Sequence, residues 1–119
     1  MIDRFPEQTA PLSQFEEEVL LPAVTEILGT RFGRKNQISN AEIRRTLNEW
    51  HIASSGPRIR KVINHIRRNG IIKFLLAGRH GYYIAEDLVD IEDYICSLRH
   101  REEAIKEIRT SLETQAYVI

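Results

Sequence analysis

The side chains best suited to chemistry in this sequence are cationic and amide groups concentrated in residues 54–69. No Asp or Glu occurs from Ala53 to Gly81. Apolar residues recur in the segment at helical spacing, as Ile59, Val62, Ile63 and Ile66. At about 100° per residue, this spacing predicts a helix with one apolar face. The opposite face and its shoulders then carry Lys61, Asn64, Arg68, Arg58, Arg60, His65 and Arg67.

A cationic face of this kind suits a polyanion. A solvated helix usually mixes Glu with Lys to gain pairs between neighbouring turns, and this segment does not. Arg can donate two parallel hydrogen bonds to guanine, and Asn can bond adenine through two atoms. Ser54 and Ser55, at the start of the helix, suit a phosphate. Lys61 and Arg68 are expected to point away from the core, so that replacing them leaves stability unchanged.

The charge is distributed in three blocks, although the 17 basic and 17 acidic residues sum to zero. Residues 1–30 hold one basic and six acidic residues, a net of −5. Residues 31–80 hold twelve basic and two acidic residues, a net of +10, and residues 81–119 hold four and nine, a net of −5. The middle block therefore predicts either a nucleic-acid surface or a basic surface that docks an acidic protein segment.

The sequence offers little support for metal binding, catalysis or a membrane span. Cys96 and His100 are four residues apart on a predicted helix, but two ligands do not make a metal site. No Gly-rich phosphate loop, activated serine or zinc spacing occurs, so we expect no enzyme activity, no catalytic residue, no metal and no cofactor. A single cysteine, no secretory signal and no apolar run of roughly 20 residues indicate a cytoplasmic protein without a membrane span.

Helix signals divide the N-terminal part of the chain. Residues 1–11 are expected to be a flexible lead-in. Ser13 and Glu16 fit a capping box for a first helix to Leu28, with a kink or break at Pro22. Its predicted inward stripe is Phe15, Val19, Ala23 and Ile27, flanked by Leu20, Val24 and Leu28. The triplet Glu16 to Glu18 is interpreted as helix-start and solvated charge.

Two further helices precede a hairpin. Ser39 or Asn40 is expected to cap a second helix that ends near Trp50. Its predicted inward residues are Ile43, Leu47 and Trp50. The third helix, 54–69, closes at Asn69-Gly70. Residues 71–77 and 82–85 are predicted strands joined by a four-residue loop, and either Tyr82 or Tyr83 should be buried.

Asp87 or Asp90 is expected to cap a last helix that ends near Ser111 or Leu112. An a/d rhythm of apolar residues runs along it and fails at Glu102 and Arg109. The rhythm comprises Leu88, Ile91, Ile95, Leu98, Ile105 and Leu112, with Ile108 as a neighbouring contact. This helix is predicted either to pack on the first helix or to form a homodimer, with the homodimer preferred.

The order of these elements resembles the winged-helix domains of bacteriophage and prophage proteins. The resemblance covers about residues 12–112. It is carried by the stretches Ile38–Ile43, Pro57–Gly70, Gly81–Ala85 and Tyr94–Leu98. It implies a mostly α fold with a small β-hairpin (α+β), with residues 12–86 as a winged helix-turn-helix between an N-terminal helix and a long C-terminal helix, 87–119.

The resemblance implies that the protein binds double-stranded DNA in a bacterial cell or phage-infected host, as a transcriptional regulator or replication accessory. Helix 54–69 would enter the major groove, and hairpin 71–85 would act as the wing. The expected DNA-binding residues are Ser54, Ser55, Arg58, Arg60, Lys61, Asn64, His65, Arg68, Arg79, His80, Arg44 and Arg45. The alternative is a winged-helix module whose basic face docks an acidic partner.

Overall fold

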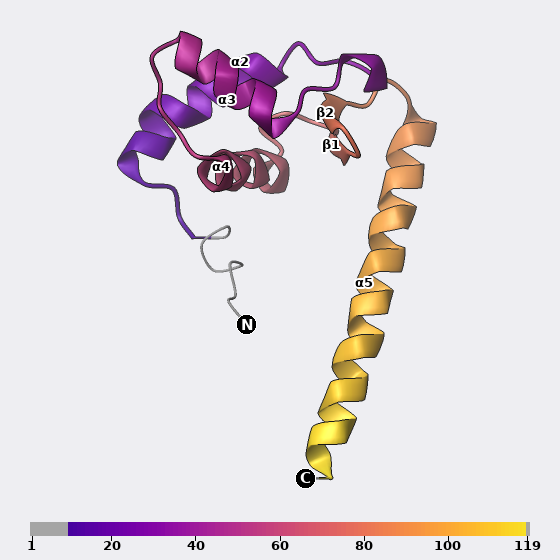
Figure 1. Cartoon of the computed structure of the whole chain (residues 1–119). Helices are drawn as coiled ribbons and strands as arrows, with labels where there is room; N and C mark the ends of the chain where they lie inside the picture. Colours follow the sequence, from indigo (N-terminus) through magenta and orange to yellow (C-terminus); the bar gives the residue numbers. More distant parts are fainter. Residues whose placement is uncertain (1–9, 119) are drawn as a thin grey trace. The chain divides into compact units, whose positions relative to one another are not determined.

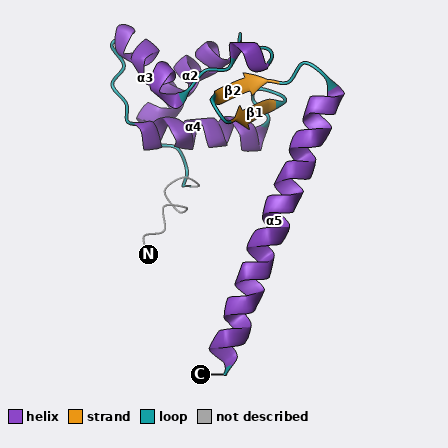
Figure 2. Cartoon of the chain, turned by 45° about the vertical axis from the view of Figure 1, so that its right-hand side comes forward, coloured by secondary structure: helices purple, strands orange, loops and turns teal. Residues whose placement is uncertain are grey.

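The computed structural model of the chain describes residues 10–118 (Figure 1). The predicted flexibility of residues 1–11 therefore falls largely outside the described residues. The fold is mostly helical with one small antiparallel sheet, which confirms the α+β prediction (Figure 2). The chain divides into an N-terminal unit, which ends at Glu86, and a C-terminal unit, which begins at Asp87.

The first helix contains a π-helical turn. After Ser13 the chain enters the turn η1 (Glu16–Leu20), which leads directly into α2 (Leu21–Leu28). The predicted capping box is present, since Ser13 Oγ accepts from the Glu16 amide at 3.2 Å and Glu16 Oε1 accepts from the Ser13 amide at 2.8 Å. Pro22 stays within the helix, where a kink or break was predicted. The π turn just before Pro22 widens the helix, so the proline ring avoids a clash with a backbone carbonyl of the preceding turn.

The π turn changes which side chains of this helix are buried. Phe15 and Val19, predicted to face inward, are 37% and 38% exposed. Glu16 and Leu20 are buried in their place, at 4% and 0%. An extra residue in one turn rotates all preceding side chains relative to an ideal helix, because each residue adds about 100°. The interpretation of Glu16 as a solvated charge was therefore wrong.

Two well-capped helices follow. Helix α3 (Asn40–Glu49) begins at the N-cap Ser39, whose side chain completes a capping box with Glu42. Helix α4 (Gly56–Asn69) begins at the N-cap Ser55 and ends at Gly70, which has the left-handed φ of 62°. Ile43 and Leu47 are buried as predicted, but Trp50 is 41% exposed because α3 ends one residue before it.

The hairpin is shorter than predicted. Strands β1 (Leu75–Gly78) and β2 (Gly81–Ile84) pair antiparallel and leave a two-residue turn, Arg79-His80, in place of the four-residue loop. Residues 71–74 form turns instead of strand, and Phe74 has a φ of 61°. Of the two tyrosines, Tyr83 is buried, with 3% exposure, and Tyr82 is partly buried.

The segment between α2 and α3 pairs with the hairpin. Ile38 and Tyr82 exchange two backbone hydrogen bonds of 3.0 and 2.8 Å, and the Gly33 amide donates to the Ile84 carbonyl at 2.8 Å. A short 3-10 turn, η2 (Arg34–Asn36), lies between these contacts. Backbone bonding therefore continues beyond β2 to a third segment, which sequence periodicity did not reveal.

The N-terminal unit has a single apolar core. It brings together side chains from the first helix, α3, α4 and the hairpin. Four residues of α4 are completely buried, and they are those predicted to form its apolar face: Ile59, Val62, Ile63 and Ile66. In the C-terminal unit, α5 (Leu88–Tyr117) has Asp87 as its N-cap and runs five or six residues past the predicted end.

Candidate nucleic-acid interface

One side of α4 presents a stripe of donor side chains. Arg60, Asn64 and Arg68 follow one another at intervals of four residues, away from the buried face. Arg60 and Arg68 are exposed and Asn64 is partly buried. Arg68 Nε donates to the carbonyl of Asn64 at 3.4 Å, which directs the guanidinium along the helix. We call Arg60, Asn64 and Arg68 the α4 stripe.

The flank of α4 beside this stripe is occupied by a carboxylate of the same chain. Lys61 Nζ lies 2.8 Å from Glu16 Oε1, and Arg58 Nε lies 3.0 Å from Glu16 Oε2. The Lys61 side chain is only 17% exposed, and that of Arg58 is 40% exposed. Lys61 was expected to point away from the core, and it lies opposite the buried face of α4, but it is not open to solvent because the rotated first helix brings Glu16 against it.

The charge of Glu16 is strongly stabilised at this position. Burial raises the pKa of Glu16, but hydrogen bonds from Lys61, the Ser13 amide and Arg58 outweigh burial and lower the pKa to about 2. The group therefore remains a carboxylate at any pH near neutral. It pairs with two cations on α4 that the sequence suggested for DNA binding, and it offsets one of their two positive charges.

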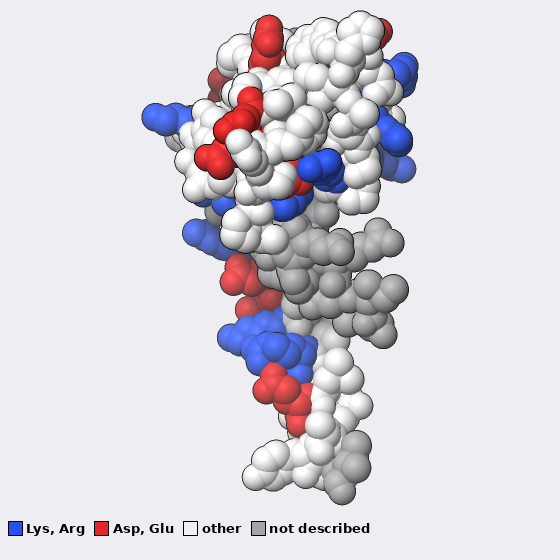
Figure 3. Space-filling view, turned by 90° about the vertical axis from the view of Figure 1, so that its left-hand side faces the viewer, with Lys and Arg blue, Asp and Glu red and all other residues white. Residues whose placement is uncertain are grey.

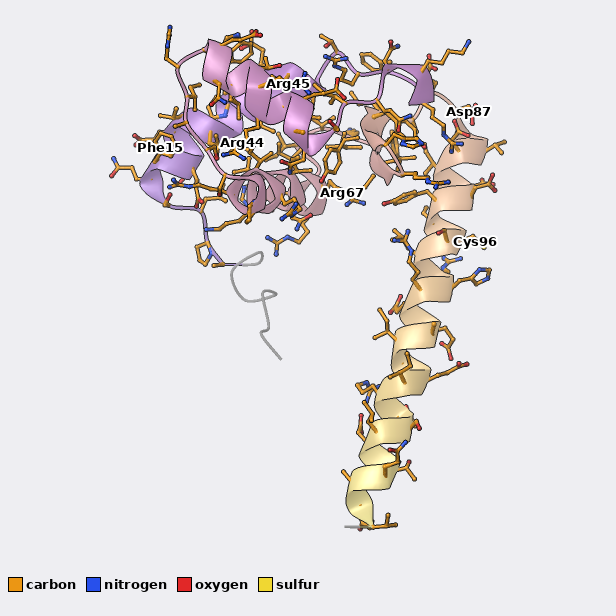
Figure 4. The ribbon with its side chains drawn as sticks, viewed as in Figure 1. Phe15, Arg44, Arg45, Arg67, Asp87 and Cys96 are labelled. Carbon is orange, nitrogen blue, oxygen red and sulfur yellow. The ribbon has the colours of Figure 1, made fainter. Side chains whose placement is uncertain are left out.

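Arg58 is held by more than this ion pair. Its guanidinium lies 4.8 Å from the centre of the Phe15 ring and donates to Ser13 Oγ at 3.4 Å. Figure 4 labels Phe15 on the first helix, where its exposed ring supports the cation. Arg58 and Lys61 therefore join the first helix to α4.

Neither serine at the start of α4 presents a free hydroxyl at the surface. Ser55 Oγ accepts from the Arg58 amide at 3.3 Å and caps the helix. The hydroxyl oxygen of Ser54 is buried without a hydrogen-bond partner among the described residues. The start of α4 is held against α3, because Asn40 Nδ2 donates to the Gly56 carbonyl at 3.2 Å.

His65, farther along α4, is partly buried and borders a hollow with Pro11 and Leu12.

The hairpin turn supplies a second cationic element. Arg79 and His80 are exposed at the turn and border a shallow hollow with Ser39 and Asn40, at the start of α3. Behind the turn, Tyr83 Oη accepts from Arg34 Nη2 at 3.3 Å.

Two further predicted residues, Arg44 and Arg45, are exposed on α3 (Figure 4). On the face of the N-terminal unit seen in Figure 3, acidic side chains gather near the middle and Lys and Arg lie mostly at the margins. Of the acidic residues Glu16 to Glu18 on the first helix, Glu16 forms ion pairs with cations of α4. The sequence did not identify Glu16 as part of this surface, and its capping-box position was the only available signal.

The C-terminal unit holds the other polar pair noted in the sequence. Cys96 Sγ and His100 Nε2 are 3.9 Å apart on the exposed surface of α5. Within residues 10–118, no cluster of three or more His, Cys, Asp or Glu residues could hold a metal ion. In the same part of the chain, no helix combines the length and apolar character needed to cross a membrane.

Comparison with known proteins gives no further guide to this surface. No protein-family description, curated protein or solved structure matches the chain.

Proposed function

We propose that residues 12–86 form a winged helix-turn-helix domain that binds double-stranded DNA. In this proposal α4 enters the major groove, and the turn between β1 and β2 contacts the backbone or the minor groove. The protein would act in the bacterial cytoplasm as a phage-type transcriptional regulator or replication accessory, without catalysis. The α4 stripe and Arg79 are the principal contacts.

The arrangement of elements supports this assignment. Helices α3 and α4 are joined by a short link, and the hairpin follows α4 directly. The segment that contains Ile38 bonds to β2, so the hairpin is anchored along one edge. A fixed hairpin beside an exposed helix face is what a wing requires.

The observation that carries the proposal is the exposure of Arg60 and Arg68 on one side of α4. Neither side chain forms an ion pair with any described residue. By contrast, Arg58 and Lys61 share an ion pair with the single carboxylate of Glu16. The remaining exposed cations of α4 are available to an external anion, and DNA carries one charge for each ~1.7 Å of helix axis.

The test is a fluorescence-anisotropy titration of a labelled random duplex at about 50 mM salt. Replacing Arg60 and Arg68 together with Ala should weaken binding by roughly tenfold or more, because two phosphate or base contacts are lost. The melting temperature should not change, because both side chains are exposed. The matched control replaces Arg99 and Lys106 with Ala on the exposed surface of α5, which removes the same charge and should preserve affinity.

Docking of an acidic protein segment is the second candidate, and one observation favours it. A carboxylate, Glu16, already binds two cations of α4. If a labelled acidic peptide binds at about 50 mM salt while the labelled duplex does not, this proposal would replace the DNA proposal.

A further inference from the structure

The helix α5 is long and exposed. It runs for 30 residues, about 45 Å at 1.5 Å per residue. None of its residues is buried, and several large apolar side chains are open to solvent. The exposed fractions are 41% for Leu98, 66% for Ile105 and 58% for Leu112. An isolated helix with this much open apolar surface is marginal in water and gains stability by burying that surface.

The apolar residues of α5 recur at heptad spacing. Ile91, Leu98, Ile105 and Leu112 are each seven residues apart, so they occupy every a position of four heptads. In a straight helix such a stripe drifts by about 20° per heptad, and a left-handed supercoil removes the drift. The corresponding d positions alternate apolar with polar: Tyr94, Arg101, Ile108 and Gln115.

We propose that α5 pairs with α5 of a second copy of this chain as an antiparallel two-stranded coiled coil. The apolar a positions of α5 keep a strict seven-residue spacing, which fits another heptad helix, whereas a helix packed on a globular core follows the 3.6-residue period. The partner is therefore a second copy of α5. This pairing does not depend on DNA binding by the N-terminal unit.

Charge determines the direction of pairing. Residues 86–93 contain five acidic residues, and residues 86–98 contain no Lys or Arg. Residues 99–118 contain four basic and four acidic residues. A parallel pair would place the acidic ends of both helices about 10 Å apart, near the Debye length of about 8 Å. An antiparallel pair places each acidic end against the balanced half of the partner.

The polar d position Arg101 favours the same direction. In a parallel pair the two Arg101 side chains would share one core layer, whereas antiparallel layers pair a with d. The antiparallel alignment that overlaps nearly all of α5 sets Leu98 against Ile108 of the second copy. It also sets Tyr94 against Leu112 of the second copy.

The first experiment measures mass by sedimentation equilibrium on the full chain at micromolar concentration. We expect twice the chain mass of 13.9 kDa. Replacing Leu98 and Ile105 together with Glu should give the single-chain mass while near-ultraviolet circular dichroism shows an unchanged N-terminal unit. The matched control, Cys96→Glu with Thr110→Glu, adds the same charge to the opposite face of α5 and should stay dimeric. A single-chain mass for the unmodified protein, or a mass above the dimer, overturns the proposal.

The second experiment tests direction by oxidation in a Cys96→Ser background, which removes the chain's one cysteine. Chains with Leu98→Cys are mixed with chains with Ile108→Cys. Antiparallel pairing predicts a covalent dimer in the mixture and little in either variant alone, since the two copies of residue 98 are about 15 Å apart along the axis. Efficient crosslinking of Leu98→Cys to itself would show parallel pairing and overturn the proposal.

Discussion

The carboxylate of Glu16 lies 2.8 Å from the ammonium of Lys61, although 45 residues separate them in the chain. This contact fixes the first helix against α4 and divides the cations of α4 into two groups. Arg58 and Lys61 join α4 to the first helix through Glu16, with Lys61 largely covered and Arg58 still 40% exposed. Arg60 and Arg68 remain on its surface.

Neutralising Glu16 should destabilise the N-terminal unit. In Glu16→Gln, Lys61 would lose its counter-charge while 17% exposed, and breaking a largely buried pair costs about 3 kcal/mol. Urea unfolding followed by Trp50 fluorescence measures this loss. The control is Glu17→Gln at the exposed neighbouring position, which should change stability by less than about 0.5 kcal/mol. Equal stabilities for the two variants would contradict the prediction.

Protonation of Glu16 should lower the stability of the N-terminal unit in acid. Its pKa is about 2 in the folded protein against an ordinary value of 4.5, so the unfolded state binds a proton first as the pH falls. The stabilisation is complete above pH 4.5 and is lost between pH 4.5 and about 2, an effect on the order of 3 kcal/mol. Unfolding free energies measured across this range should fall more steeply for the unmodified chain than for Glu16→Gln. Parallel curves would exclude Glu16 as the cause.

Gly81 should tolerate no side chain. Its φ is 142°, and a Cβ there would lie 2.3 Å from the carbonyl oxygen of Ile38. Gly81→Ala should therefore separate the Ile38 segment from β2, at a cost on the order of 3 kcal/mol. Thermal unfolding compares it with Gly70→Ala, where φ is 62° but no atom lies within 4 Å. That control should cost only about 1 kcal/mol. A smaller loss for Gly81→Ala than for Gly70→Ala would refute the packing argument.

DNA affinity should fall steeply as the salt concentration rises. The slope of log K against log salt should show whether the hairpin turn contacts a phosphate. If Arg79 contacts one phosphate, Arg79→Ala lowers the slope of log K against log salt by about 0.9 and weakens all duplex sequences alike. Anisotropy titrations between about 50 and 200 mM salt measure this slope. Arg99→Ala on α5 should leave the slope unchanged. An unchanged slope for Arg79→Ala would remove the hairpin turn from the interface.

Local signals in the sequence predicted much of the fold. Ser13 and Ser39 cap helices as expected, and Gly70 ends α4 in the left-handed conformation. The buried face of α4 is also as predicted, because Ile59 and its partners follow the ideal helical period. These features depend on residues within one or two turns of each other, which is the range over which sequence patterns are informative.

Features that depend on distant contacts were not predicted. The π turn before Pro22 has no periodic signal, and it changes the buried residues from Phe15 and Val19 to Glu16 and Leu20. For the same reason, Lys61 was assigned to the exposed surface. The pairing of Ile38 with Tyr82 spans a single bridge, which is too short to produce an alternating pattern.

The wide turn Glu16–Leu20 contains one residue more than an ordinary helical turn. Removing one residue from that turn, such as Val19, would restore the ordinary pitch, and the two changes would cancel for every upstream position. Glu16 would then stay beside Lys61 in the shortened chain. Restoring the ordinary pitch without a deletion would instead rotate Phe15 into the place of Glu16, so the ion pair between the first helix and α4 depends on the extra residue being accommodated as a π turn.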